Sequence, residues 1–169
     1  LKMGDRVGLF GFDARPNIST GAVSGVKSFT LLQHLAARLD YSTEETNFTL
    51  GLTQLSAETQ RRSLIVVFTD FADPTSAELM IENVARLMKK HLVLFVALRD
   101  QELEAMTQEE PAKLMDATRS VIAHSLLVEK ELVLSRLQRL GAEIINAPAG
   151  RIGPELLNRY LELKRHGRI

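Results

Sequence analysis

Carboxylate side chains follow several of the apolar segments of this sequence, and they are the residues best suited to do chemistry. Asp13, Asp70 and Asp100 each come directly after or just beyond an apolar run, and Asp73 lies three residues after Asp70. Oxygen donors from Asp and Thr, without His or Cys, suit Mg²⁺, Mn²⁺ or Ca²⁺ and do not suit Zn²⁺. Alternatively, Asp70 and Asp73 form turns and cap helices, which is the commoner role of an aspartate after a strand.

A polar loop supplies further donors. Residues 41–47 are polar almost throughout and separate two helical patterns, so we predict a loop there. Thr46 and Asn47 stand at its end. In open α/β sheets, ligands gather at the edge where the carboxyl ends of the strands meet, which we call the rim. If this loop folds over the rim beside Asp13, Asp70 and Asp73, these side chains together form a surface rich in oxygen donors.

Motifs of known enzyme classes are absent from the sequence. It has no Gly-rich dinucleotide fingerprint, no phosphate-binding loop, no His-Glu-x-x-His and no Gly-x-Ser-x-Gly. It also has no cysteine, which excludes disulfides, zinc-thiolate sites and thiol nucleophiles. The histidines are scattered over different predicted helices and ends: His34, His91, His124 and His166. We therefore expect no catalytic residue and no enzyme activity.

The charge and hydropathy of the sequence argue against a nucleic-acid-binding protein and against a membrane-spanning segment. Lys plus Arg and Asp plus Glu both number 21, so the net charge is zero and offers no general attraction to nucleic acid or to an anionic membrane. No apolar run approaches the ~20 residues that cross a bilayer. With 169 residues the chain is predicted to form one domain over residues 1–169.

The elements that must position the polar residues alternate along the chain. Residues 63–69 and 92–98 show no polar alternation, which is typical of strands covered on both faces in a parallel sheet. The remaining pattern predicts strands at 6–12, 17–23 and 142–147, and helices at 27–39, 48–56, 74–90, 101–140 (interrupted at Pro111) and 153–165. The fold class is therefore α/β, a doubly wound and mostly parallel sheet with one antiparallel edge strand.

Several phrases of the sequence together carry a resemblance. They are GDRVGLFGFD at 4–13, ETNF at 45–48, RRSLIVVFTDF at 61–71, HLVLFVALRD at 91–100 and GPELLNRYL at 153–161. The sequence resembles the von Willebrand factor A-like half of the bacterial proteins of the domain of unknown function 58 family. The resemblance covers essentially the whole chain.

The resemblance implies a von Willebrand factor A-like (Rossmann-like) fold. It also implies a protein partner, a MoxR-type AAA+ ATPase, in assembly or regulation, and a cytoplasmic location with a tether to the inner membrane through upstream segments. Domains of this kind bind Mg²⁺ or Mn²⁺ at an Asp-x-Ser-x-Ser motif after the first strand, with a Thr and an Asp from later loops. On that pattern Thr46 matches the Thr and Asp70 matches the final Asp.

The sequence departs from this pattern because it contains no Asp-x-Ser-x-Ser. In the family, the first strand and that motif are expected upstream of Leu1. We therefore expect the chain to be an N-terminally truncated domain. The sheet is then expected to have a gap between the strand at Val7 and the strand at Leu64. Three outcomes are open: the two strands pair directly, another chain fills the gap, or the exposed edges make the protein associate with itself. Two donors make a poor Mg²⁺ site, so we expect weak or no metal binding, with a dissociation constant for Mg²⁺ or Mn²⁺ no tighter than about 10 μM.

Two functions from different classes follow, and a third possibility is a purely structural domain of a membrane-anchored protein, with no bound ligand. The first is a protein-interaction module whose rim of Asp13, Thr46, Asn47, Asp70 and Asp73 docks a partner. The alternative is a Mg²⁺-dependent hydrolase or phosphotransfer enzyme that uses Asp70 and Asp73. A homo-oligomer is also a possible assembly, because an unfilled sheet edge favours self-association.

Overall fold

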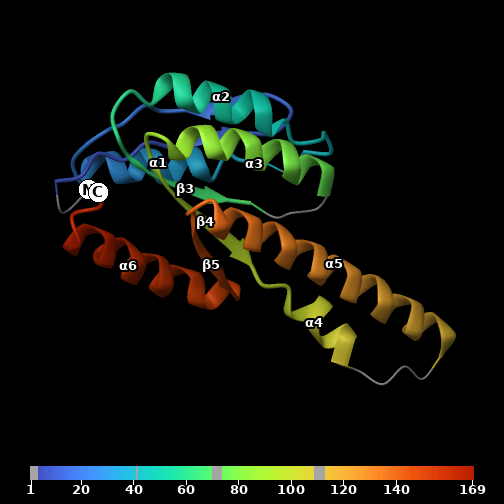
Figure 1. Ribbon diagram of the computed structural model, residues 1–169. Helices are drawn as coiled ribbons and strands as arrows, with labels where there is room; N and C mark the ends of the chain where they lie inside the picture. Colours follow the sequence, from blue (N-terminus) through green and yellow to red (C-terminus); the bar gives the residue numbers. More distant parts are fainter. Residues whose placement is uncertain (1–3, 41, 70–73, 109–112) are drawn as a thin grey trace.

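The strands of the protein form two separate sheets with helices around them (Figure 1). The structure is a computed structural model, and it describes residues 4–40, 42–69, 74–108 and 113–169. The elements in chain order are β1 (Phe10–Phe12), β2 (Pro16–Ser19), α1 (Lys27–Ala36), α2 (Phe48–Glu58), β3 (Leu64–Phe68), α3 (Pro74–Met88), β4 (Leu92–Leu98), α4 (Gln101–Gln108), α5 (Leu114–Arg139), β5 (Glu143–Ala147) and α6 (Ala149–Arg165). The predicted α/β class is confirmed.

The larger sheet is parallel and has helices on both faces. Its order is β3-β4-β5, with Leu64 opposite Leu92 and Leu94 opposite Glu143. One face of β4 packs against α3, and its Val93 and Phe95 belong to a core cluster that also holds residues of α2 and α5. The other face packs against α6. Every residue of β4 except Leu98 is buried, as expected for a strand with a neighbour on each side.

β3 is less buried than its sequence predicts. The apolar run suggests cover on both faces, yet Ile65 is its only fully buried residue and Phe68 is 65% exposed. The reason is position, since among the described residues β3 is an edge strand of its sheet and pairs with β4 alone. Apolar composition alone does not distinguish a central strand from an edge strand.

The smaller sheet is the antiparallel pair β1-β2, and it is attached through α2 and not through strand pairing. Phe12 packs edge-on against Phe48, with ring centroids 5.8 Å apart. Its ring also lies over Gly51, where a Cβ would stand 2.3 Å from the nearest ring carbon. No hydrogen bond joins β1 to β3 in the described part of the chain. Direct pairing of those strands, one of the three outcomes above, is therefore wrong.

Two helices differ from their predicted form. α1 begins at the predicted residue, but none of its residues is buried, and Phe29 of its apolar stripe is 56% exposed. α6 begins at Ala149 and not at residue 153, so that Pro154 lies inside it. Pro148, in an extended conformation, marks the true start. Pro154 is the sixth residue of α6, where it lacks the N–H that would otherwise donate to the carbonyl of Gly150, so the helix forgoes one backbone hydrogen bond in its second turn.

The predicted broken helical region forms a hairpin, and Pro111 falls outside the described residues. α4 packs along α5, and together they project from the body as an arm (Figure 1). The arm ends at the body, where Val133, Leu134 and Leu137 are buried and Gly141 takes a φ of +95° after the helix. No helix within the described residues has the length and apolar character needed to span a bilayer.

Candidate functional site

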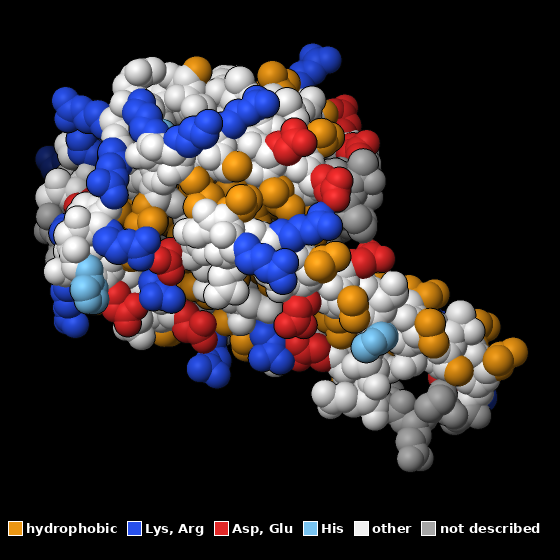
Figure 2. Space-filling view, viewed as in Figure 1, with side chains coloured by type: hydrophobic (Ala, Val, Ile, Leu, Met, Phe, Trp, Pro, Cys, Tyr) orange, Lys and Arg blue, Asp and Glu red, His pale blue; other side chains and the backbone are white. Residues whose placement is uncertain are grey.

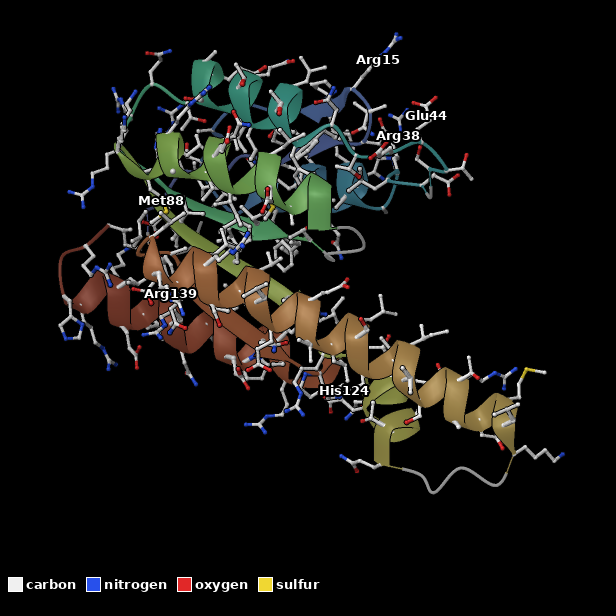
Figure 3. All side chains as sticks on the ribbon, turned by 45° about the vertical axis from the view of Figure 1, so that its right-hand side comes forward. Arg15, Arg38, Glu44, Met88, His124 and Arg139 are labelled. Atoms are coloured by element: carbon white, nitrogen blue, oxygen red, sulfur yellow. The ribbon has the colours of Figure 1, made fainter. Side chains whose placement is uncertain are left out.

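The predicted rim forms where the end of β1 meets the start of α2. The backbone N–H of Asn47 donates to the carbonyl of Asp13 at 2.9 Å, which joins the two loops directly. Figure 3 shows the nearby Arg15, Arg38 and Glu44 gathered at this end of the molecule. The structure thus brings together three of the five predicted rim residues, Asp13, Thr46 and Asn47.

Two of these side chains also shape the loops that carry them. The Asn47 Oδ1 accepts from the backbone N–H of Leu50 at 2.9 Å and caps the start of α2. Asp13 accepts from the backbone N–H of Arg15 at 3.1 Å and from the Asn17 amide at 3.2 Å. The rim is therefore built on an ordered helix start and a tight turn.

A pocket of about 300 Å³ opens at this rim. Its lining residues are Ala14, Glu45, Thr46, Asn47, Phe48, Thr49 and Leu79. The lining combines two hydroxyls, an amide and one carboxylate with the apolar side chains of Ala14, Phe48 and Leu79, and the described lining contains no histidine, lysine or arginine. Thr49 is in turn held from α3, because the Asn83 amide donates to its hydroxyl at 3.2 Å. This lining suits reversible contact with another surface better than proton transfer.

The predicted metal site, Thr46 with Asp70, is described only in part. Asp70 and Asp73 lie outside the described residues, so Thr46 is the only described member of the partial site. Within the described ranges no three His, Cys, Asp or Glu side chains gather as a metal cluster. Asp13, at the end of β1, already accepts two hydrogen bonds. The described donors do not supply the six oxygens that Mg²⁺ prefers.

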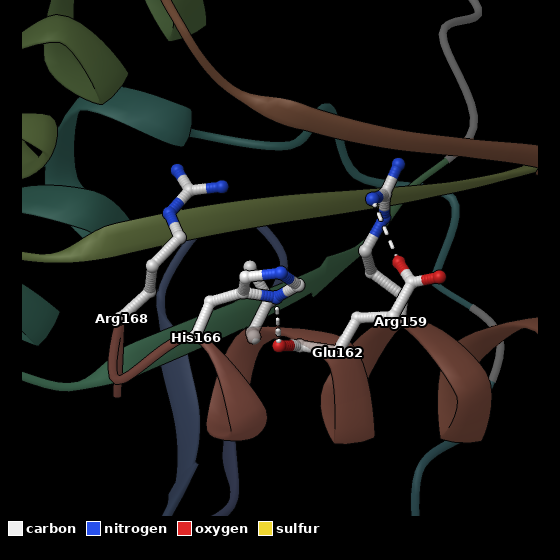
Figure 4. A pocket seen from close by; sticks show the side chains of 5 residues that line it. Arg159, Glu162, His166 and Arg168 are labelled. Atoms are coloured by element: carbon white, nitrogen blue, oxygen red, sulfur yellow. Dashed lines mark hydrogen bonds and ion pairs between the residues drawn. The ribbon is translucent and has the colours of Figure 1, made fainter.

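A second cavity, of about 410 Å³, lies at the C-terminal end of α6, around Leu163 (Figure 4). Its arginines are paired within the protein: Arg159 contacts Glu162 at 3.0 Å, and Arg168 contacts Glu143 at 2.5 Å. The His166 ring nitrogen Nδ1 lies 2.8 Å from the carbonyl of Glu162. These internal pairs leave little positive charge for an anion, so the cavity is a structural junction between α6 and β5.

Sequence reasoning missed a polar cluster that joins the two ends of the chain. Asp5 accepts hydrogen bonds from the Tyr160 hydroxyl and, at 2.8 Å, from the Lys164 ammonium. The bond from Lys164, followed by that from Tyr160, lowers the pKa of Asp5. Burial and then the bond to Asp5 raise the pKa of Tyr160. The signal in the sequence is the spacing of four between Tyr160 and Lys164, which places both on one face of α6.

His91 is buried at the start of β4, far along the chain from any rim residue. It is 5% exposed, and neither ring nitrogen has a hydrogen-bond partner among the described atoms. Burial, with a smaller effect from Lys90, lowers its pKa. Burial therefore favours the neutral form of the ring.

Comparison with known proteins gives one match. A family model described as "Protein of unknown function DUF58" matches residues 1–138, which end within α5. No curated protein and no solved structure matches the chain.

Proposed function

The chain belongs to the DUF58 family, and from that premise and the rim geometry we propose that it is a protein-interaction module that docks its partner at the Thr46 pocket. The observation that carries this proposal is the lining of the pocket. Hydroxyl and amide groups surround Phe48 and Leu79, and the loops that hold them are fixed by the Asn47 cap. A preformed surface of apolar and hydrogen-bonding groups is what a docking site needs.

The partner that we propose is a MoxR-type AAA+ ATPase, and the support for it is the sequence resemblance stated above. The role that we propose is assembly or regulation alongside that ATPase. A divalent ion held in part by Thr46 and Asp70 would add a bridge to a carboxylate on the partner. No step of the docking at the described residues depends on that ion.

The test is binding of a purified MoxR-type ATPase from the same organism to the immobilised chain, measured by biolayer interferometry. Thr46→Arg places a long cation in the half-buried mouth of the pocket and is expected to weaken binding at least tenfold. The matched control is Thr53→Arg, on the exposed side of α2 and outside the pocket, which is expected to change binding less than twofold. Equal binding by both variants, or no binding by the unmodified chain, would overturn the proposal.

Two further arms separate the metal and the enzyme alternatives. Repeating the measurement with Mn²⁺ and with a chelator, in the native chain and in Asp70→Ala, shows whether the ion bridges the complex. The alternative function, a Mg²⁺-dependent hydrolase or phosphotransfer enzyme using Asp70 and Asp73, predicts turnover of generic phosphoesters that Asp70→Asn abolishes. Such turnover would replace the interaction proposal with the enzyme one.

A further inference from the structure

The α4-α5 arm exposes an apolar stripe along α5 on the side away from α4. Its positions recur with spacings of four and three residues, the repeat of a coiled coil, and four of the six are large apolar residues while Thr118 and Ser125 are small and polar: Leu114, Thr118, Val121, Ser125, Val128 and Leu132. Leu114 is 86% exposed, Val121 70% and Val128 52%. Ala123, on the opposite side of the helix, is 1% exposed. The stripe is therefore the face of α5 that α4 leaves uncovered.

From this stripe we propose that a second copy of the chain binds along α5, with the two arms antiparallel. Spacings of 4, 3, 4, 3 and 4 read the same in both directions, so a copy turned end for end meets the stripe in register. Leu114 then faces Leu132 of the second copy, Thr118 faces Val128, and Val121 faces Ser125. A two-fold symmetric interface of this kind is the commonest way in which soluble proteins self-associate.

The charges beside the stripe fit the antiparallel arrangement. Lys113 and Arg119 lie near the tip of the arm, and Glu129 and Glu131 lie near its base. By heptad position, Glu129 and Glu131 flank the stripe on opposite sides. Arg119 lies one position further round the helix on the side of Glu129, and Lys113 does so on the side of Glu131. In the antiparallel pair each basic residue of one copy comes level with an acidic residue of the other, twice by symmetry. A parallel pair would place like charges opposite each other.

The apolar surface is large enough for a dimer of ordinary size. Seven large apolar side chains of α5 are between 42% and 86% exposed: Leu114, Met115, Val121, Ile122, Leu126, Val128 and Leu132. Four of them belong to the stripe, and Met115, Ile122 and Leu126 lie beside it on the side of Glu129. At about 100 Å² each, the four stripe residues of two copies contribute on the order of 800 Å², and the three beside the stripe raise the total toward about 1,400 Å², within the ~1,200–2,000 Å² of specific interfaces. Figure 2 shows hydrophobic side chains along the arm, which stands clear of the body. Figure 3 shows His124 on the same helix.

The first experiment is sedimentation velocity of the chain over a range of concentrations. A concentration-dependent dimer is expected, and Val121→Glu is expected to weaken it at least tenfold because the charge enters the centre of the stripe on both copies. The control is Leu157→Glu on α6, 57% exposed, which is expected to leave the dimer unchanged. A monomer at every concentration would overturn the proposal, and so would a dimer that both variants leave intact, as expected if the edge of β3 were the interface.

A second experiment reads the direction of the pair directly, because the chain has no cysteine of its own. Val121→Cys and Ser125→Cys chains, mixed and oxidised, are expected to form the mixed disulfide faster than either variant alone forms its own. A faster disulfide of Val121→Cys with itself would show a parallel pair and would overturn the antiparallel arrangement. Neither experiment involves the Thr46 pocket, so this inference stands or fails separately from the proposed function.

Discussion

Gly51 is the position where a single methyl group has the clearest expected effect. Its backbone lies on α2 beneath the Phe12 ring, and a Cβ would stand 2.3, 2.5 and 2.6 Å from three carbons of that ring. To reach an ordinary contact of about 3.5 Å the ring must move by about 1 Å. Such overpacking costs about 1–3 kcal/mol. In an open helical position, Gly→Ala would instead contribute about 1 kcal/mol through helix propensity.

The two effects oppose each other, and the contact is expected to dominate. Gly51→Ala is therefore predicted to lower the free energy of unfolding by about 1 kcal/mol, and Tm by about 2–4 °C for a chain of this length. The assay is urea and thermal unfolding followed by circular dichroism. Gly150→Ala is the control, since a Cβ at Gly150 meets no atom within 4 Å and the residue lies in the first turn of α6. It is predicted to be neutral or slightly stabilising.

A double-mutant cycle identifies the ring as the cause. In a Phe12→Leu background, the smaller side chain leaves room for the methyl group, and Gly51→Ala is expected to lose about 1 kcal/mol of its cost. If Gly51→Ala proves as stable as the native chain, or if Phe12→Leu leaves its cost unchanged, then the hairpin does not dock on α2 as described. The packing argument for the rim would fail with it, because Asp13 follows Phe12 directly.

Two further predictions concern pH and the junction of the chain ends. In the folded protein the pKa of His91 lies below its ordinary value of 6.5. Its contribution to stability is therefore complete above about pH 6.5 and is lost as pH falls toward the folded pKa. In the His91→Leu variant, the free energy of unfolding in urea is expected to depend less on pH between about pH 5 and 7. A slope unchanged in that variant would contradict the assignment. Asp5 also has a lowered pKa, so its contribution is present above its ordinary value of 3.8 and is lost on further acidification. Asp5→Asn is expected to lower Tm slightly at pH 7 but not at pH 2. A double-mutant cycle of Asp5→Asn with Lys164→Met at pH 7 is expected to show a coupling free energy that high salt reduces. Additive effects of the two substitutions on stability would refute a direct ion pair.

The sequence predicted the elements well where periodicity and end signals agreed. β3, β4 and β5 lie within one residue of their predicted bounds, since apolar runs ended by polar residues mark buried strands. Pro74 was predicted to open α3, and it does. The start of α6 was misplaced because Pro154 suggested a helix start, whereas Pro148 in fact precedes the helix.

Long-range relations were harder to predict. The meeting of Asp13 with Asn47 was predicted only on the condition that the loop at 41–47 folds over the rim, and the backbone hydrogen bond between them was not predicted. The cluster of Asp5 with Lys164 joins residues 159 positions apart, and no local pattern links them. The exposure of Phe29 on α1 had the same cause, because an amphipathic stripe indicates a helix without showing what packs against it.

The separation of the two sheets has a consequence for amide hydrogen exchange. In a parallel strand, successive N–H groups point alternately to the two neighbours. β4 has a strand on each side, so all its interior amides are expected to exchange slowly. β3 pairs on one side only, so slow and fast amides are expected to alternate along it. If an added strand occupied that edge, the fast set alone would become slow, and the alternation would disappear.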